Sequence, residues 1–298
     1  MLCCITFAVV NIGLNSVAMV DEKDEEFEEQ QFLFMMEEAY TQKKGEWQVI
    51  FTAQYMDGKK SREVEYEDEE KEDKLKIRDE WRWIAEIEYG ILDWLQLEVE
   101  IPLAYVDQRT IKESEDSGRT ISDLKKGGLS DINACLRARL LKEDVDQWWL
   151  PTVSAGFEVI FPTGNWEEGL GTDRYGWEGK LAISKVIDKF VVHLNGGMGR
   201  TDNAKEEGET ENIDEQEFEC GAALVYRPTD RLDFICETLA GFEEEKTAGG
   251  KNYETEFYLT PGIRYKLFKD FEIGAGVPVG LTYASSDWGI MTKAQYEW

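Results

Sequence analysis

The sequence predicts an all-β protein, a single antiparallel β-barrel of about twelve strands that spans a membrane. Three observations support this prediction. Segments of alternating apolar and polar residues recur along the chain, short and long connections alternate between them, and aromatic residues gather near the segment ends. Each observation rests on a different property of the chain, so their agreement carries more weight than any one of them.

Alternation with a period of two residues begins at Trp47 and restarts many times along the chain. Successive side chains of a strand point to opposite faces, so each segment has one apolar and one polar face. We expect strands to begin near Glu46, Leu75, Leu95, Ser130, Trp149, Trp177, Phe190, Glu217, Leu232, Tyr253, Phe271 and Trp288. A soluble sandwich would show the same alternation, so this pattern alone does not indicate a membrane.

The lengths of the connections distinguish a barrel from a sandwich. Residues 90–94 and 267–270 form short connections, whereas 57–74, 107–128 and 200–216 are long and charged. This order is typical of an outer-membrane barrel, which has tight periplasmic turns and longer extracellular loops. An even number of strands also allows the first and last strands to pair, which removes the open edge.

Aromatic residues provide an independent check, because threading the strands up and down places them in two belts. One belt lies near the short turns: Trp47, Tyr89, Trp148, Trp149, Phe190, Tyr226, Tyr265, Phe271, Tyr296 and Trp298. The other lies near the long loops: Tyr55, Trp81, Tyr105, Phe161, Trp177, Phe218, Phe242 and Trp288. Amphipathic rings favour the headgroup level of a bilayer, so two belts indicate two membrane interfaces.

Three regions are expected along the chain. Residues 1–18 are uncharged, mostly apolar and end in Ser16-Val17-Ala18, which is typical of a cleavable signal peptide. A membrane anchor is the alternative, but the run is shorter than the roughly 20 residues that a span needs. Residues 19–44 form an acidic leader, and residues 45–298 form the barrel.

The leader becomes apolar at residues 32–36, after the acidic run 21–29. This pattern is compatible with a short helix, either filling the lumen as a plug or lying in the periplasm. A solvated segment is the alternative, and the high charge density of the leader favours it.

The composition limits the function classes. The chain of 298 residues carries a net charge of −29, which argues against a nucleic-acid partner. The mean hydropathy of −0.48 would argue against a helical membrane protein, but a barrel accommodates polar residues in its lumen. The single histidine, His193, shares its face with Asn195, and no serine is placed for activation. We therefore expect neither an enzyme nor a metal or cofactor.

Three short segments resemble one family of bacterial outer-membrane barrels, the MetA-pathway phenol-degradation or transporter family. They are YTQKKGEW at residues 40–47, GGLSD at 127–131 and FPTGN at 161–165. The resemblance implies a pore or carrier for small-molecule solutes that is surrounded by outer-membrane lipid. The C-terminal segment 290–298 alternates and ends in an aromatic residue, so it resembles the signal by which such proteins reach the outer-membrane assembly machinery.

Strand parity assigns a set of charged side chains to the lumen. The candidate lumen and selectivity residues are Arg82, Glu86, Glu88, Glu98, Glu100, Asp131, Arg137, Arg139, Glu158, Glu237, Glu256 and Arg264. Carboxylates outnumber bases, so we expect the pore to prefer cations. A barrel of this size can also be filled by its own side chains. The alternative function is therefore a non-conducting structural or surface-interaction barrel whose acidic loops bind a partner.

Overall fold

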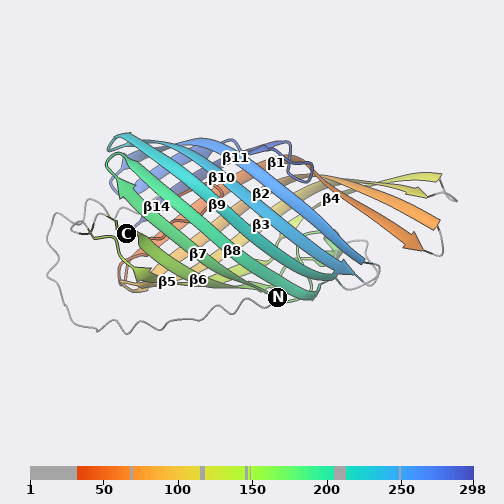
Figure 1. Ribbon diagram of the computed structural model, residues 1–298, viewed down its shortest axis with the longest axis horizontal. Coiled ribbons are helices and arrows are strands. Elements are labelled where there is room, and N and C mark those ends of the chain that lie inside the picture. Colours follow the sequence, from red (N-terminus) through yellow and green to blue (C-terminus); the bar gives the residue numbers. More distant parts are fainter. Residues whose placement is uncertain are drawn as a thin grey trace.

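A computed structural model describes residues 32–67, 70–114, 118–144, 147, 149–204, 213–247 and 250–298. In these ranges the chain forms one closed antiparallel barrel of twelve strands around the ring (Figure 1). The ring closes where β14 (Trp288–Glu297) pairs with β1 (Trp47–Glu67). The expected signal peptide 1–18, leader residues 19–31 and Trp148 lie outside the described residues. No helix in the described part of the chain is long and apolar enough to cross a membrane.

The strands begin close to where the alternation predicts them. The other ten of the ring are β2 (Glu70–Leu92), β3 (Leu95–Ser114), β5 (Ile132–Leu141), β6 (Thr152–Phe161), β7 (Gly176–Ile187), β8 (Phe190–Ala204), β9 (Ile213–Thr229), β10 (Leu232–Thr247), β11 (Gly250–Phe268) and β12 (Phe271–Gly276). Two further strands, β4 (Gly118–Leu129) and β13 (Val279–Gly280), add to this ring. The predicted fold class is therefore confirmed.

The outer wall of the barrel is apolar and carries paired aromatic rings. Residues directly opposite each other in an antiparallel pair share a face. Trp47 and Tyr89 are opposite, with ring centroids 4.5 Å apart, at the end of the short turns. At the other end Tyr55 lies opposite Trp81, with centroids 4.6 Å apart, and its ring also contacts Trp288. These contacts are those expected at two membrane interfaces.

Two of the expected loops are largely strand. Residues 57–74 and 107–128 were expected to be charged loops, but β1 continues to Glu67, β2 begins at Glu70 and β4 pairs along β3. These hairpins extend beyond the wall of the barrel (Figure 1). Charged residues occupy both odd and even positions of these segments, so the alternation disappears from the sequence while the ladder of backbone hydrogen bonds continues. Cross-strand ion pairs such as Lys125–Asp107, at 2.6 Å, accompany the ladder.

A plugged and charged lumen as the candidate functional site

Residues 32–42, here named the plug, run through the lumen without forming a helix or a strand. The side chains of Phe32, Leu33 and Phe34 are at most 4% exposed, and they belong to one apolar cluster with inward-facing Val191 and Val225. Burial of this apolar run places the described leader residues inside the barrel. The high charge density of the leader favours a solvated segment instead, and for these residues the structure differs from that expectation. The densest acidic run, 21–29, lies outside the described residues.

Glycines on the inner wall provide the space for the plug. A Cβ atom added to Gly262 would lie 2.2 Å from a ring carbon of Phe34, and one added to Gly276 would lie 2.9 Å from the same ring. A Cβ at Gly274 would meet the ring of Phe32 at 2.8 Å. Because real Cβ contacts are not this short, any larger residue at these positions would displace the plug.

One barrel carboxylate holds the start of the plug. Glu237 is fully buried on β10. It accepts hydrogen bonds from the backbone N–H groups of Phe34, Met35 and Met36 at 2.6, 2.8 and 3.2 Å. A buried segment without secondary structure must find other partners for its backbone donors. Glu237 supplies three of them from a single side chain.

Other inward-facing side chains also bind backbone groups farther along the plug. The amide of Asn195 accepts from the N–H of Glu37 at 2.6 Å and donates to its carbonyl at 2.8 Å. Ser184 accepts from the N–H of Ala39 at 2.9 Å, and Gln96 from the N–H of Gln42 at 2.6 Å. The barrel thus substitutes side chains for the missing strand partner.

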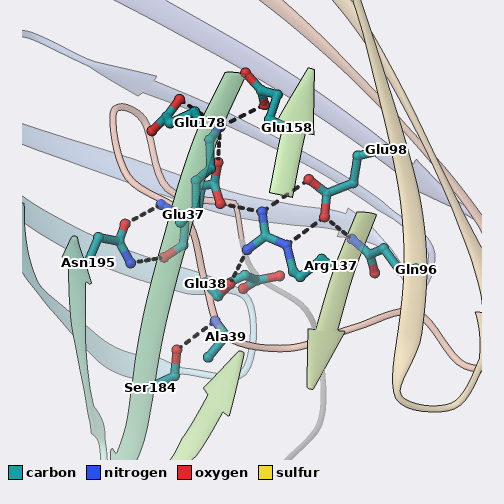
Figure 2. A network of polar contacts seen from close by, with 11 residues as sticks. Glu37, Glu38, Ala39, Gln96, Glu98, Arg137, Glu158, Glu178, Ser184 and Asn195 are labelled. Carbon is teal, nitrogen blue, oxygen red and sulfur yellow. Dashed lines mark hydrogen bonds and ion pairs between the residues drawn. The ribbon is translucent and has the colours of Figure 1, made fainter. Parts of the chain in front are cut away.

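An ion-pair network links the middle of the plug to the wall, as Figure 2 shows. Glu37 accepts from both Arg137 and Lys180, the latter at 2.9 Å. Each base also binds a wall carboxylate, Arg137 pairing with Glu98 at 2.5 Å and Lys180 with Glu158 at 2.8 Å. Every member of this chain of charges therefore has an opposite charge beside it, which a buried charge requires.

The pKa of Glu37 reflects these neighbours. Burial would raise the pKa of this carboxyl, but the charges of Arg137 and Lys180 outweigh burial and hold the pKa at about 2. Glu37 is therefore ionised throughout the physiological range.

A cavity of about 250 Å³ lies between the plug and the wall formed by β1, β2 and β3. Glu86, Glu88 and Glu100 line it, together with Lys293 from β14. Glu86 lies directly opposite Glu100, and Glu88 directly opposite Glu98. Like charges in such positions repel each other.

The remaining predicted lumen residues also lie on the inner face, but in different surroundings. Arg264 pairs with Asp233 and lies 5.6 Å from the ring centroid of Phe32. At the periplasmic end, Arg139 donates to the carbonyl of Asp93 at 2.7 Å. Asp131, Arg82 and Glu256 lie nearer the extracellular end, where Asp131 binds a connecting loop. Strand parity predicts that these side chains face inward, but it does not predict the partners that they bind.

A serine lies beside His193, although the sequence pattern indicates none placed for activation. Ser184 on β7 lies directly opposite His193 on β8, and its hydroxyl is 2.8 Å from Nδ1 of the ring. Alternation along one strand does not reveal this contact, because the serine lies on the neighbouring strand. Both residues are fully buried beneath the plug, where Ser184 also binds Ala39. In the described ranges, no group of three or more Asp, Glu, His or Cys side chains is arranged to hold a metal ion.

Comparisons with known proteins give one family and several distant structures. A family model described as "Putative MetA-pathway of phenol degradation" matches residues 89–298, more than half of the chain. No curated protein matches the sequence.

Among solved structures, the chain is similar to the transport unit of the autotransporter AIDA-I from Escherichia coli. The identity is 9% and the TM-score 0.44, over 88% of this chain and 92% of that one. A FadL homologue from Pseudomonas aeruginosa is 8% identical with a TM-score of 0.41, over 86% and 90% of the two chains.

Proposed function

The chain belongs to the family described as the putative MetA-pathway of phenol degradation, and from this premise we propose that it is a gated pore or carrier for small molecules. It is an outer-membrane β-barrel. In the proposal its lumen prefers cations, and the plug must shift before a solute passes. Export through the periplasm and assembly through the C-terminal strand belong to the same proposal.

The observation that carries the proposal is the paired glutamates of β2 and β3 beside the cavity under the plug. Three of their carboxylates and two plug carboxylates, Glu37 and Glu38, line this space, against the two bases Arg137 and Lys293. A wall with surplus carboxylates lowers the energy of a passing cation. The plug is held by hydrogen bonds and ion pairs to side chains and not by a strand ladder, so it can leave without opening the barrel.

The alternative is a permanently closed, non-conducting barrel. The extent of the plug's anchoring favours it, because at least six backbone donors of the plug are bound by wall side chains. In this case the charged hairpins would be the functional part.

Single-channel recording under a salt gradient separates the two proposals. The mature chain and a variant lacking residues 32–42 would be refolded and inserted into a planar bilayer. The matched control shortens the β3–β4 hairpin by replacing residues 113–119 with Asn-Gly, a sequence suited to a tight turn. We expect discrete, cation-selective steps from the plug deletion, and silence or rare steps from the intact chain and the control.

Two results would contradict the proposal. An anion-selective reversal potential from the deletion variant would overturn the cation preference. A deletion variant that is folded and inserted but silent would overturn the pore and favour the closed barrel.

A further inference from the structure

Two hairpins join beyond the extracellular rim of the barrel into one small sheet, here named the crown. It consists of residues 59–67 of β1, 70–80 of β2, 104–114 of β3 and 118–129 of β4. In the described part of the chain β4 pairs with β3 alone, so its other side is a free edge (Figure 1). An edge of this kind presents backbone N–H and C=O groups that a further strand can bind.

The ladder between β3 and β4 determines which backbone groups point to the free edge. The N–H of Ser130 donates to the carbonyl of Pro102 at 2.9 Å, so these two residues occupy a hydrogen-bonded position of the ladder. Such positions alternate along antiparallel strands, and the register of this pair has no shift. The even-numbered residues of β4 therefore bind β3, and the odd-numbered residues direct their N–H and C=O groups to the free edge.

The outer half of this edge, GRTISDL at residues 118–124, has a composition that favours pairing. It contains neither the lysine nor the proline that commonly protects an edge, and it includes the β-branched Thr120 and Ile121. Ile121 lies opposite Ile111 of β3, which in turn lies opposite Leu75 of β2. Because Ile121 is 56% exposed, an apolar row of the crown ends uncovered at the free edge.

Two ion pairs flank this apolar row on the same face of the crown. Arg109 pairs with Asp123 at 3.0 Å on one side of Ile121, and Glu113 pairs with Arg119 at 3.7 Å on the other. All four charges thus have partners within the chain, and none requires a counter-charge from outside. Along the free edge, however, a base and an acid lie two residues before and two residues after the exposed isoleucine.

We propose that the free edge of β4 pairs antiparallel with the same edge of a second copy of this chain, with Ile121 opposite the second copy's Ile121. This register places Arg119 opposite the second copy's Asp123, and Asp123 opposite its Arg119. The odd-numbered backbone groups of both edges then face each other and can complete the ladder. Charges of alternating sign extend across four strands on both sides of a continuous apolar row. The edge is therefore self-complementary, as a twofold-symmetric contact requires.

Other registers are less favourable. A shift of two residues toward the barrel places Arg119 opposite Lys125, and a shift of four places Asp123 opposite its own copy, so like charges meet. A shift of six pairs Asp123 with Lys125, but it brings the tip of the second hairpin to the level of Leu129, below the aromatic belt of the long loops. A shift in the other direction places Arg119 opposite Ile121 and loses both ion pairs.

The symmetry of the contact determines where the second copy lies. A twofold axis that relates antiparallel strands is perpendicular to them, and the β3–β4 hairpin extends from the barrel along its long axis (Figure 1). The two barrels therefore point in opposite directions and lie in two facing outer membranes. A contact between residues 118–124 of two copies is small, so many copies must act together to hold the membranes.

Clustering of vesicles that contain the full, refolded chain tests this contact without any measurement of conduction. Asp123→Arg and Arg119→Asp each place like charges opposite one another when a variant pairs with itself. Each should therefore reduce clustering, measured by dynamic light scattering, by about tenfold or more. Mixing vesicles of the two variants should restore clustering, because every position of one edge then faces an opposite charge on the other. Restored clustering also shows that both variants fold.

Lys125→Asp is the matched control. It reverses a charge on the same face of β4 and breaks an ion pair within the chain, that with Asp107, but it lies outside residues 118–124. It should leave clustering unchanged. The proposal is wrong if vesicles of the unaltered chain stay dispersed, or if the mixture of Asp123→Arg and Arg119→Asp does. It is also wrong if Lys125→Asp disperses the vesicles as far as Asp123→Arg does, since the contact would then not lie at residues 118–124.

Discussion

Arg137 and Arg82 illustrate how the two halves of the lumen differ. Both arginines are assigned to the lumen by strand parity, yet the side chain of Arg137 is 7% exposed and that of Arg82 is 47% exposed. In the periplasmic half, the plug brings its own carboxylate and carbonyl to Arg137. In the extracellular half, Arg82 pairs with Glu80 of the same strand. The plug therefore covers Arg137, whereas Arg82, which is paired within its own strand, stays more exposed.

The largest effect should come from removing the acceptor of three plug amides. Glu237→Leu leaves the N–H groups of residues 34–36 buried without a partner, which costs about 1–3 kcal/mol for each unsatisfied donor. Loss of the buried carboxylate offsets part of this cost. We expect hydrogen exchange of residues 34–36, followed by mass spectrometry, to accelerate by about tenfold or more.

Glu217→Leu is the control for that change, because Glu217 is an inward carboxylate of β9 that lies opposite Glu243 of β10. It should leave the exchange of the plug unchanged. Equal acceleration in both variants would show a general loosening of the barrel, and the anchoring role of Glu237 would be wrong.

A smaller effect should follow from adding one methyl group to the wall. Gly262→Ala places a Cβ where Phe34 now lies, and overpacking of this kind costs about 1–3 kcal/mol. Gly241→Ala is the matched control, since a Cβ there would have no neighbour closer than 3.9 Å. Exchange across residues 32–36 should rise in the first variant only. Unchanged exchange in Gly262→Ala would mean that the wall gives way and the plug does not.

The facing of the wall residues and the position of the plug differ in how far the sequence predicts them. Alternation alone assigns Glu237 and Arg264 to the lumen, because facing depends only on the period of the strand. The contact between Glu37 and Arg137 joins residues 100 positions apart, and no period encodes it. The small residues Gly274 and Gly276 on the inner face of β12 were a visible signal for the plug. These glycines indicate a plug only when they are considered together with the apolar run 32–36, because the aromatic rings of that run occupy the space beside the glycines.

The smallest effect is the pH dependence of the plug's ion pair. The pKa of Glu37 in the folded chain is about 2, below its ordinary value of 4.5. The ionised carboxylate therefore stabilises the plug fully above about pH 4.5, and this contribution is lost as the pH falls from there through about 2. Because the side chain is 34% exposed, the contribution is on the order of 1 kcal/mol.

Comparing the intact chain with Glu37→Gln isolates this contribution from all other titrating groups. The difference in plug exchange between the two proteins, corrected for the intrinsic exchange rate at each pH, should stay constant from pH 7 to pH 5 and shrink below pH 4.5. Glu38→Gln serves as the control, because Glu38 contacts Arg137 through its backbone carbonyl, which the substitution retains. A difference that already shrinks between pH 7 and pH 5 would show that Arg137 and Lys180 do not keep Glu37 ionised. The ion-pair network in the periplasmic half would then stabilise the plug less than its geometry indicates.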